Sequence, residues 1–159
     1  LPVLVTGVSA IHKAQIAFSL AEEQMLIITE DEVTASRFAD DINQMAGDNI
    51  CLVYPAKDYV FTDIEGASYE YEHRRLDVLS RLLSGKCRII AASIEAVLQK
   101  TISKERLNES IITLKQNDDI EIKELLSKLV SIGYSRADEK VEGAAQFSAR
   151  GSIVDIFLV

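Results

Sequence analysis

The sequence predicts an α/β fold, a parallel sheet with helices on both faces, joined to a small inserted α+β module. Over residues 1–100, short and almost continuously apolar runs alternate with amphipathic helical segments, the pattern of a parallel sheet that is covered on both faces. Near residue 103 the rhythm changes to one helix among short strands. No repeat or low-complexity linker separates the two parts, which indicates an inserted module rather than a tethered one.

The first part of the chain contains four strand-like runs. They lie at residues 2–6, 25–29, 49–55 and 87–93. Between and after them, apolar residues recur at helical spacing in segments near 11–23, 30–47, 69–84 and 94–100. Gly47 is the last residue of the second of these segments and Gly85 follows the third, both at a position where glycine commonly ends a helix.

The second part contains one clear helix. In residues 119–134, five apolar residues fall on one helical face, and Gly133 is expected just past its end. SIITLKQND (110–118) predicts a strand that ends in a polar turn. RADEKV, AAQFSAR and SIVDIFLV predict short strands of an antiparallel or mixed sheet, with turns near Glu142-Gly143 and at Gly151.

These patterns place three segments along the chain. Residues 1–103 form the α/β domain, 104–149 the small α+β module, and 150–159 a strand that returns toward the α/β domain. Because the chain begins without Met and stops directly after a strand-like run, we expect it to be a piece of a longer protein.

The charge balance argues against nucleic acid as the main partner of this chain. It carries 17 Lys and Arg against 25 Asp and Glu, a net charge of −8, whereas phosphate contacts need clustered cations. No apolar run approaches the roughly 20 residues that cross a bilayer, and no signal peptide is recognisable. We therefore expect a cytoplasmic protein that binds no membrane.

Cys51 and Cys87 each lie in an apolar strand-like run. This placement predicts free, buried thiols in a reducing compartment, with a disulfide or a functional thiol as the less favoured alternative. His12 and His73 are the only histidines, so no zinc-ligand spacing exists. We expect neither a metal nor a cofactor in this part of the protein.

The chain carries a broken phosphate-binding loop near its start. The working pattern is G-x-x-x-x-G-K-[ST] between a strand and a helix. In VTGVSAIHKAQ, Gly7 and Lys13 are in place, but His12 replaces the second glycine and Ala14 replaces the Ser or Thr. A histidine side chain obstructs the closest approach of the phosphates, and Ala14 offers no oxygen to Mg²⁺.

Three interpretations of this loop are open: an ordinary strand–loop–helix turn, the relic of an ancestral phosphate loop, and an active nucleotide site. The loss of both groups favours the relic. No acidic residue stands in a Walker-B position, since Glu30 and Asp31 are expected as the first residues of a helix, where carboxylates suit the helix dipole. We expect no ATP turnover and no enzymatic activity in this chain.

Three further stretches carry a family resemblance. They are residues 54–85, residues 112–142 with the pattern L-x-x-x-G-Y-x-R, and residues 147–157 with the closure F-x-x-R-G-x-x-x-D-I-F. In order and spacing they resemble the N-terminal, UvrB-like region of the bacterial transcription-repair coupling factors (Mfd). The most specific patterns are shared with the excision nuclease subunit UvrB, so other residues must separate the two.

Two features favour the coupling factors over UvrB. UvrB-like proteins keep an intact phosphate loop, whereas this one is broken. They also carry a long aromatic hairpin that clamps DNA, while the corresponding loop here, Pro55 to Ser68, holds only Tyr59 and Phe61. A UvrB-like nucleotide- or DNA-binding domain is the alternative function. Leu158 departs from the family, which usually has Pro at this place.

The resemblance implies a role in nucleotide excision repair. It implies that residues 1–103 are helicase-like but without ATPase function, and that the small module, similar to the second domain of UvrB, binds UvrA. It also implies a longer protein, an ATP- and Mg²⁺-dependent translocase that acts on RNA polymerase and double-stranded DNA. In that protein, the C-terminal region masks the UvrA-binding surface.

The resemblance assigns Arg150 to the UvrA contact. Gly151 beside it is expected to supply a bulge or a turn with positive φ that presents the side chain. A guanidinium presents a planar fork of donors to a carboxylate, which suits this role. The alternative is an ion pair of Arg150 within the chain, for example with Asp155. Tyr134 and Phe147 are expected to be core aromatics.

Arg74 and Arg75 lie among acidic residues in the predicted helix at 69–84. We expect them on a solvated helix face rather than in a basic binding patch.

Overall fold

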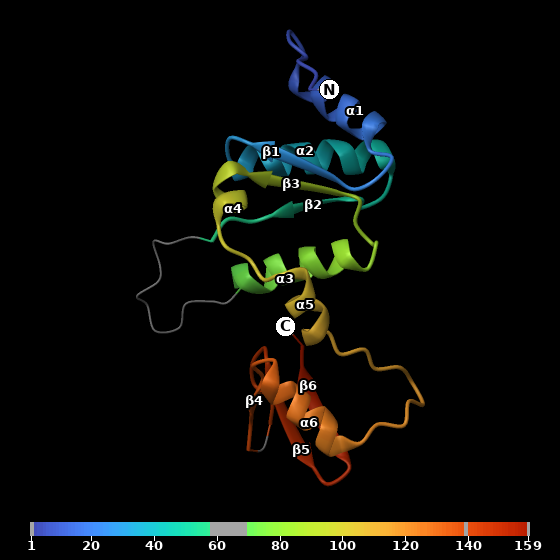
Figure 1. The fold of residues 1–159 in the computed structure, drawn as a ribbon, viewed down its shortest axis with the longest axis vertical. Helices are drawn as coiled ribbons and strands as arrows, with labels where there is room; N and C mark the ends of the chain where they lie inside the picture. The colour runs from blue at the N-terminus through green and yellow to red at the C-terminus, as the bar shows by residue number, and fades with distance from the viewer. Residues whose placement is uncertain (1, 58–69, 139, 159) are drawn as a thin grey trace. The chain divides into compact units, whose positions relative to one another are not determined.

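The computed structural model describes residues 2–57, 70–138 and 140–158 (Figure 1). The chain divides into two units, Leu1–Thr101 and Ile102–Val159. Each unit contains a three-stranded sheet of its own.

The first unit alternates helices and strands. They are α1 (Ala10–Leu20), β1 (Met25–Thr29), α2 (Glu32–Ala46), β2 (Cys51–Tyr54), α3 (Glu70–Leu83), β3 (Ile89–Ser93) and α4 (Ile94–Leu98). The strands are parallel, in the order β1-β3-β2. Because the chain reverses its direction across the sheet after β2, right-handed crossovers place α2 and α3 on opposite faces, as Figure 1 shows. The predicted parallel sheet with helices on both faces is confirmed.

The core of this unit lies on both faces of β3, whose five residues are all buried. On one face, Ile89 and Ala91 belong to a cluster with Ile42 of α2. On the other, Ile90 belongs to a second cluster with Val78 of α3. Because this strand is buried on both faces, its first four residues, Ile89–Ala92, are all apolar.

The first predicted strand is wrong, because residues 2–6 form no strand. Val3 and Leu4 are more than four-fifths exposed. An apolar run becomes a strand only where a neighbouring strand supplies hydrogen-bond partners, and the described sheet has none beside this run.

The second unit is a small α+β module. Its elements are α5 (Lys104–Ser110), α6 (Ile122–Ser131), β4 (Ser135–Arg136), β5 (Gln146–Arg150) and β6 (Ile153–Phe157). β5 is the central strand, parallel to β4 and antiparallel to β6. The predicted helix and mixed sheet are confirmed, and Phe147 is buried as expected, while Tyr134 is half-buried.

Two segments of this unit differ from the prediction. SIITLKQND forms no strand; its first residue, Ser110, ends helix α5, which was not predicted. The Ser103 hydroxyl caps that helix by accepting a hydrogen bond from the Arg106 N–H, and only Leu107 is buried. Of the described residues of RADEKV, all but Glu139, only Arg136 lies in a strand.

The last strand belongs to the small unit. Ile156 of β6 is paired with Phe147 of β5, so residues 153–157 complete this sheet. That the chain leads from there back toward the α/β unit stays a prediction.

The two cysteines are free and buried, as predicted. Burial, with Cys87 as a smaller contribution, raises the pKa of the Cys51 thiol from 9.0 to about 12. The folded protein therefore holds this thiol protonated at a pH where the unfolded chain has already lost the proton.

We expect the free energy of unfolding to fall as the pH rises above 9. The contribution of Cys51 is fully present below the pKa of the unfolded thiol and is lost as the pH rises toward the folded value. Between pH 9 and 10.5 the loss should be about 2 kcal/mol, measured by urea unfolding. A Cys51→Ala variant should fall less steeply over this range. Other groups that lose protons at high pH are the same in both proteins, so the difference between the two slopes reports Cys51 alone. An equally steep fall in the variant would show that Cys51 does not cause the pH dependence.

Candidate functional site

The broken phosphate loop leads into α1. Gly7 has a positive φ of 71°, and the helix begins at Ala10. His12 and Lys13 are exposed in the first turn, and the Ser9 hydroxyl lies 2.9 Å from His12 Nδ1. Ala14 is fully buried in the core cluster of the first unit. The residue at the metal-ligand position thus faces the protein interior.

The carboxyl ends of the strands are where α/β sheets commonly bind ligands. In this unit, side chains at that edge serve the protein itself. Asp31 caps α2 by accepting a 2.7 Å hydrogen bond from the Thr34 N–H, which holds the pKa of the Asp31 carboxyl below its usual range. Ser93 caps α4 in the same way. The expectation that Asp31 begins a helix is confirmed.

Arg75 of α3 also lies at this edge, and it is buried, with 8% of its surface exposed. Its Nη1 donates to the carbonyl oxygen of Pro55 at 2.8 Å and to Gln99 Oε1 at 2.9 Å. Its guanidinium carbon lies 4.1 Å from the centroid of the Tyr54 ring, within the range of a cation–π contact. Nη2 is buried without a hydrogen-bond partner in the described structure.

The expectation of a solvated face is therefore wrong for Arg75, although Arg74 is exposed. The helical spacing contained the missing signal. Arg75 lies three and four residues before Val78 and Leu79, on the same face of the helix. Of its acidic neighbours, Glu72 pairs with Lys57 and Asp77 with Arg81, so their charge did not predict the surroundings of Arg75.

Gln99 reinforces the same edge. It accepts a 2.6 Å hydrogen bond from the Lys57 N–H and donates from Nε2 to the Lys57 carbonyl oxygen at 3.0 Å. The chain that leaves β2 is thus fixed by side chains from α3 and from the segment after α4. By its place in the sequence, the loop from Pro55 to Ser68 corresponds to the DNA-clamping hairpin of UvrB-like proteins. Residues 58–68 of this loop, among them Tyr59 and Phe61, lie outside the described residues.

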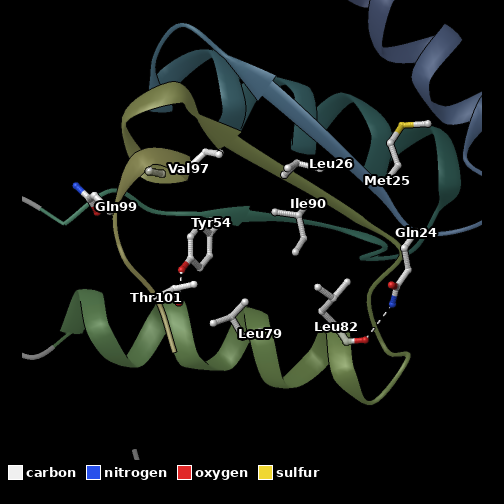
Figure 2. Close-up of a pocket in the computed structure, with 11 residues that line it drawn as sticks. Gln24, Met25, Leu26, Tyr54, Leu79, Leu82, Ile90, Val97, Gln99 and Thr101 are labelled. Carbon is white, nitrogen blue, oxygen red and sulfur yellow. Dashed lines mark hydrogen bonds between the residues drawn. The ribbon is translucent and has the colours of Figure 1, made fainter. Parts of the chain in front are cut away.

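A pocket of about 330 Å³ lies between α3 and the sheet (Figure 2). Apolar side chains dominate its lining: Leu26, Leu79, Leu82, Ile90 and Val97, with the ring of Tyr54. Its polar groups are satisfied within the protein, since Tyr54 donates to Thr101 Oγ1 and Gln24 to the Leu82 carbonyl oxygen. Among the described residues, no Asp, Glu, His, Cys, Lys or Arg lines it.

Arg150 lies at the end of β5 in the small unit. Its Nη2 donates to Asp155 Oδ2 at 2.6 Å, and the two side chains are 58% and 41% exposed. The ion pair that the sequence offered as an alternative is therefore present. An ion pair this exposed contributes about 0 to 1 kcal/mol to stability. Because the Arg150 side chain is more than half exposed, its guanidinium remains available to a partner.

The β5–β6 turn fixes where Arg150 points. Arg150 is opposite Ile153, so Gly151 and Ser152 alone form the turn. Gly151 has a φ of 62°, while Ser152 is not among the residues with positive φ. A positive φ at the first central residue alone, occupied by glycine, is the pattern of a type II′ hairpin turn. The backbone turn expected of Gly151 is confirmed.

The described residues contain neither a metal-binding cluster nor a membrane-spanning helix. No group of three or more His, Cys, Asp or Glu in the described ranges could hold a metal ion. None of the helices seen in the structure is long and apolar enough to cross a bilayer.

Comparison with known proteins places the hairpin in a recognised domain. The family model described as "UvrB interaction domain" matches residues 112–159. The transcription-repair-coupling factor of Bacillus subtilis (strain 168) is 32% identical over 157 residues, which are 97% of this chain and 13% of that protein. Those of Staphylococcus haemolyticus and of Staphylococcus aureus (strain bovine RF122) are 30% and 28% identical, again over 13% of their length and over 98% and 97% of this chain. The chain spans a small part of these relatives.

We expect the chain to bind no Mg·ATP at micromolar concentrations, because His12 occupies the place of a glycine and Ala14 is core. Calorimetric titration with and without Mg²⁺ checks this. Micromolar binding that Lys13→Ala abolishes, and that the matched exposed variant Lys86→Ala retains, would contradict the expectation.

We expect Arg75→Ala to lower the free energy of unfolding by about 2 kcal/mol, since it deletes charged hydrogen bonds to a buried acceptor, the Pro55 carbonyl, and to a part-buried one, Gln99 Oε1. Arg74→Ala, one residue away and exposed, should change it by no more than about 0.5 kcal/mol. Urea unfolding of both variants measures the difference. If Arg75→Ala lowered the free energy of unfolding no more than Arg74→Ala, the Arg75 contacts would not stabilise the fold.

Proposed function

Because the chain is homologous to the transcription-repair-coupling factors over 97% of its length and carries a UvrB interaction domain, we propose that it is a non-catalytic recruitment module. It binds UvrA through the unit formed by residues 102–159. By this binding the longer protein brings excision repair to a stalled RNA polymerase.

One observation carries the proposal most directly. Arg150 lies inside the matched domain and is more than half exposed at the end of a tight hairpin. Arginine is enriched among the residues that dominate binding energy at protein interfaces. In the part of the chain that the structure describes, its one charge partner is Asp155, which is itself 41% exposed, so a carboxylate of UvrA can approach the remaining guanidinium donors.

The first unit supports a scaffold role in this proposal. It is a helicase-like α/β domain in which the phosphate loop no longer serves nucleotide chemistry. The strand-end groups Asp31 and Ser93 cap helices, and Ala14 lies in the core. ATP and Mg²⁺ act in motor domains of the longer protein, which translocates on double-stranded DNA in the cytoplasm. Its C-terminal region masks the UvrA-binding surface until it engages polymerase.

The alternative, a UvrB-like domain that binds nucleotide or DNA, finds less support. The net charge of −8 opposes phosphate binding. A DNA gel shift at two salt concentrations separates the two functions, since electrostatic DNA binding weakens steeply with salt. Calorimetry with purified UvrA tests the proposed function itself, and absence of binding would overturn it.

We expect Arg150→Ala to weaken UvrA binding by roughly 2 kcal/mol, about thirtyfold, and Arg150→Glu to weaken it further by like-charge repulsion. The melting temperature should change little, because the lost ion pair is exposed. Calorimetry and thermal unfolding are measured on the same preparations.

The control is Lys123→Ala, which removes an exposed cation from α6 of the same unit and should bind UvrA like the parent. If Arg150→Ala also binds like the parent, or if it unfolds, Arg150 is not the contact.

A further inference from the structure

We propose that Asp155 is a positioning residue for UvrA binding: it holds the Arg150 guanidinium in the orientation that meets a carboxylate of the partner. The inference rests on the proposed function, since it concerns how the same site is kept ready for its partner.

The strand register brings the two side chains together. Arg150 is opposite Ile153, and Ser148 is opposite Asp155. Because side chains alternate along a strand, Arg150 and Asp155 are diagonal neighbours on one face of the hairpin. The two-residue turn at Gly151 fixes this register, so the carboxylate stands at a constant place relative to the arginine.

The contact uses a small part of the guanidinium. Nη2 donates to Asp155 Oδ2, and within the described part of the chain the Arg150 side chain makes no other hydrogen bond. An arginine has five N–H donors in a planar fork. The donors that Asp155 leaves unused can therefore form a second, charge-assisted pair with a carboxylate of UvrA.

Holding the arginine before binding is useful because a long side chain loses rotamer freedom when it is fixed at an interface. An arginine already ordered by Asp155 loses less of it on binding. The exposure of both partners means that the pair adds little to the stability of the fold. The pair therefore serves positioning rather than stability.

The test compares Asp155→Ala with Asp155→Asn in the 159-residue chain, titrated calorimetrically with purified UvrA. We expect Asp155→Ala to weaken binding about fivefold. Asp155→Asn keeps an acceptor oxygen at the same place and should weaken it less. The matched control Asp119→Ala, an exposed carboxylate in the same unit, should bind like the parent.

A double-mutant cycle separates positioning from direct contact or a structural role. If Asp155 acts through Arg150, adding Asp155→Ala to Arg150→Ala produces no further loss of UvrA affinity. Unchanged or tighter binding by Asp155→Ala, or the same loss in the Arg150→Ala background, would overturn the inference alone. Failure of the parent chain to bind UvrA, or parent-like binding by Arg150→Ala, would overturn the proposed function and this inference with it.

Discussion

The first unit depends on one constraint, the burial of β3 on both faces between two parallel neighbours. Parallel strands require crossovers over the sheet, and here these crossovers contain α2 and α3, which supply the two cores. All three strands consequently end at the same edge. At that edge the ends of the helices and the chain leaving β2 need hydrogen-bond partners, and Asp31, Ser93, Arg75 and Gln99 provide them. The polar side chains at the carboxyl edge of the sheet therefore stabilise the fold through their hydrogen bonds.

The parts of the fold that the sequence predicted are those that local periodicity determines. β1, β2, β3 and the amphipathic helices α2, α3 and α6 all follow from the spacing of apolar residues. Residues 2–6 and SIITLKQND also contain apolar runs, but the described sheets have no strand beside them. The sequence of an apolar run does not predict whether another strand will pair with it. Helix α5 was missed because it has seven residues and buries only Leu107, too little for a periodic signal.

The two arginines that matter most show what the sequence could and could not predict about the site. Arg75 was expected in solvent because its neighbours are acidic, yet its helical face is the apolar one. Arg150 was singled out from a motif. The sequence predicted the turn at Gly151 beside it, but not that the strand register leaves Arg150 exposed. Asp155 was foreseen only as a competing partner. The ion pair with Asp155 does not prevent Arg150 from binding a partner, because the pair uses one hydrogen bond and leaves the other guanidinium donors exposed.

Burial decides what each arginine can do. Removing Arg75 would leave the buried Pro55 carbonyl oxygen without its donor, so the bonds of Arg75 are costly to exchange for those of a partner. Arg150 and Asp155 already face water, and replacing water around them by a carboxylate of another protein requires little desolvation within this chain. The backbone beneath them is a two-residue turn in a hydrogen-bonded hairpin, which keeps an exposed group well positioned. A recognition residue in this fold is therefore expected on the hairpin, where a charge is both exposed and ordered, rather than at the sheet edge, where it is already committed to the fold.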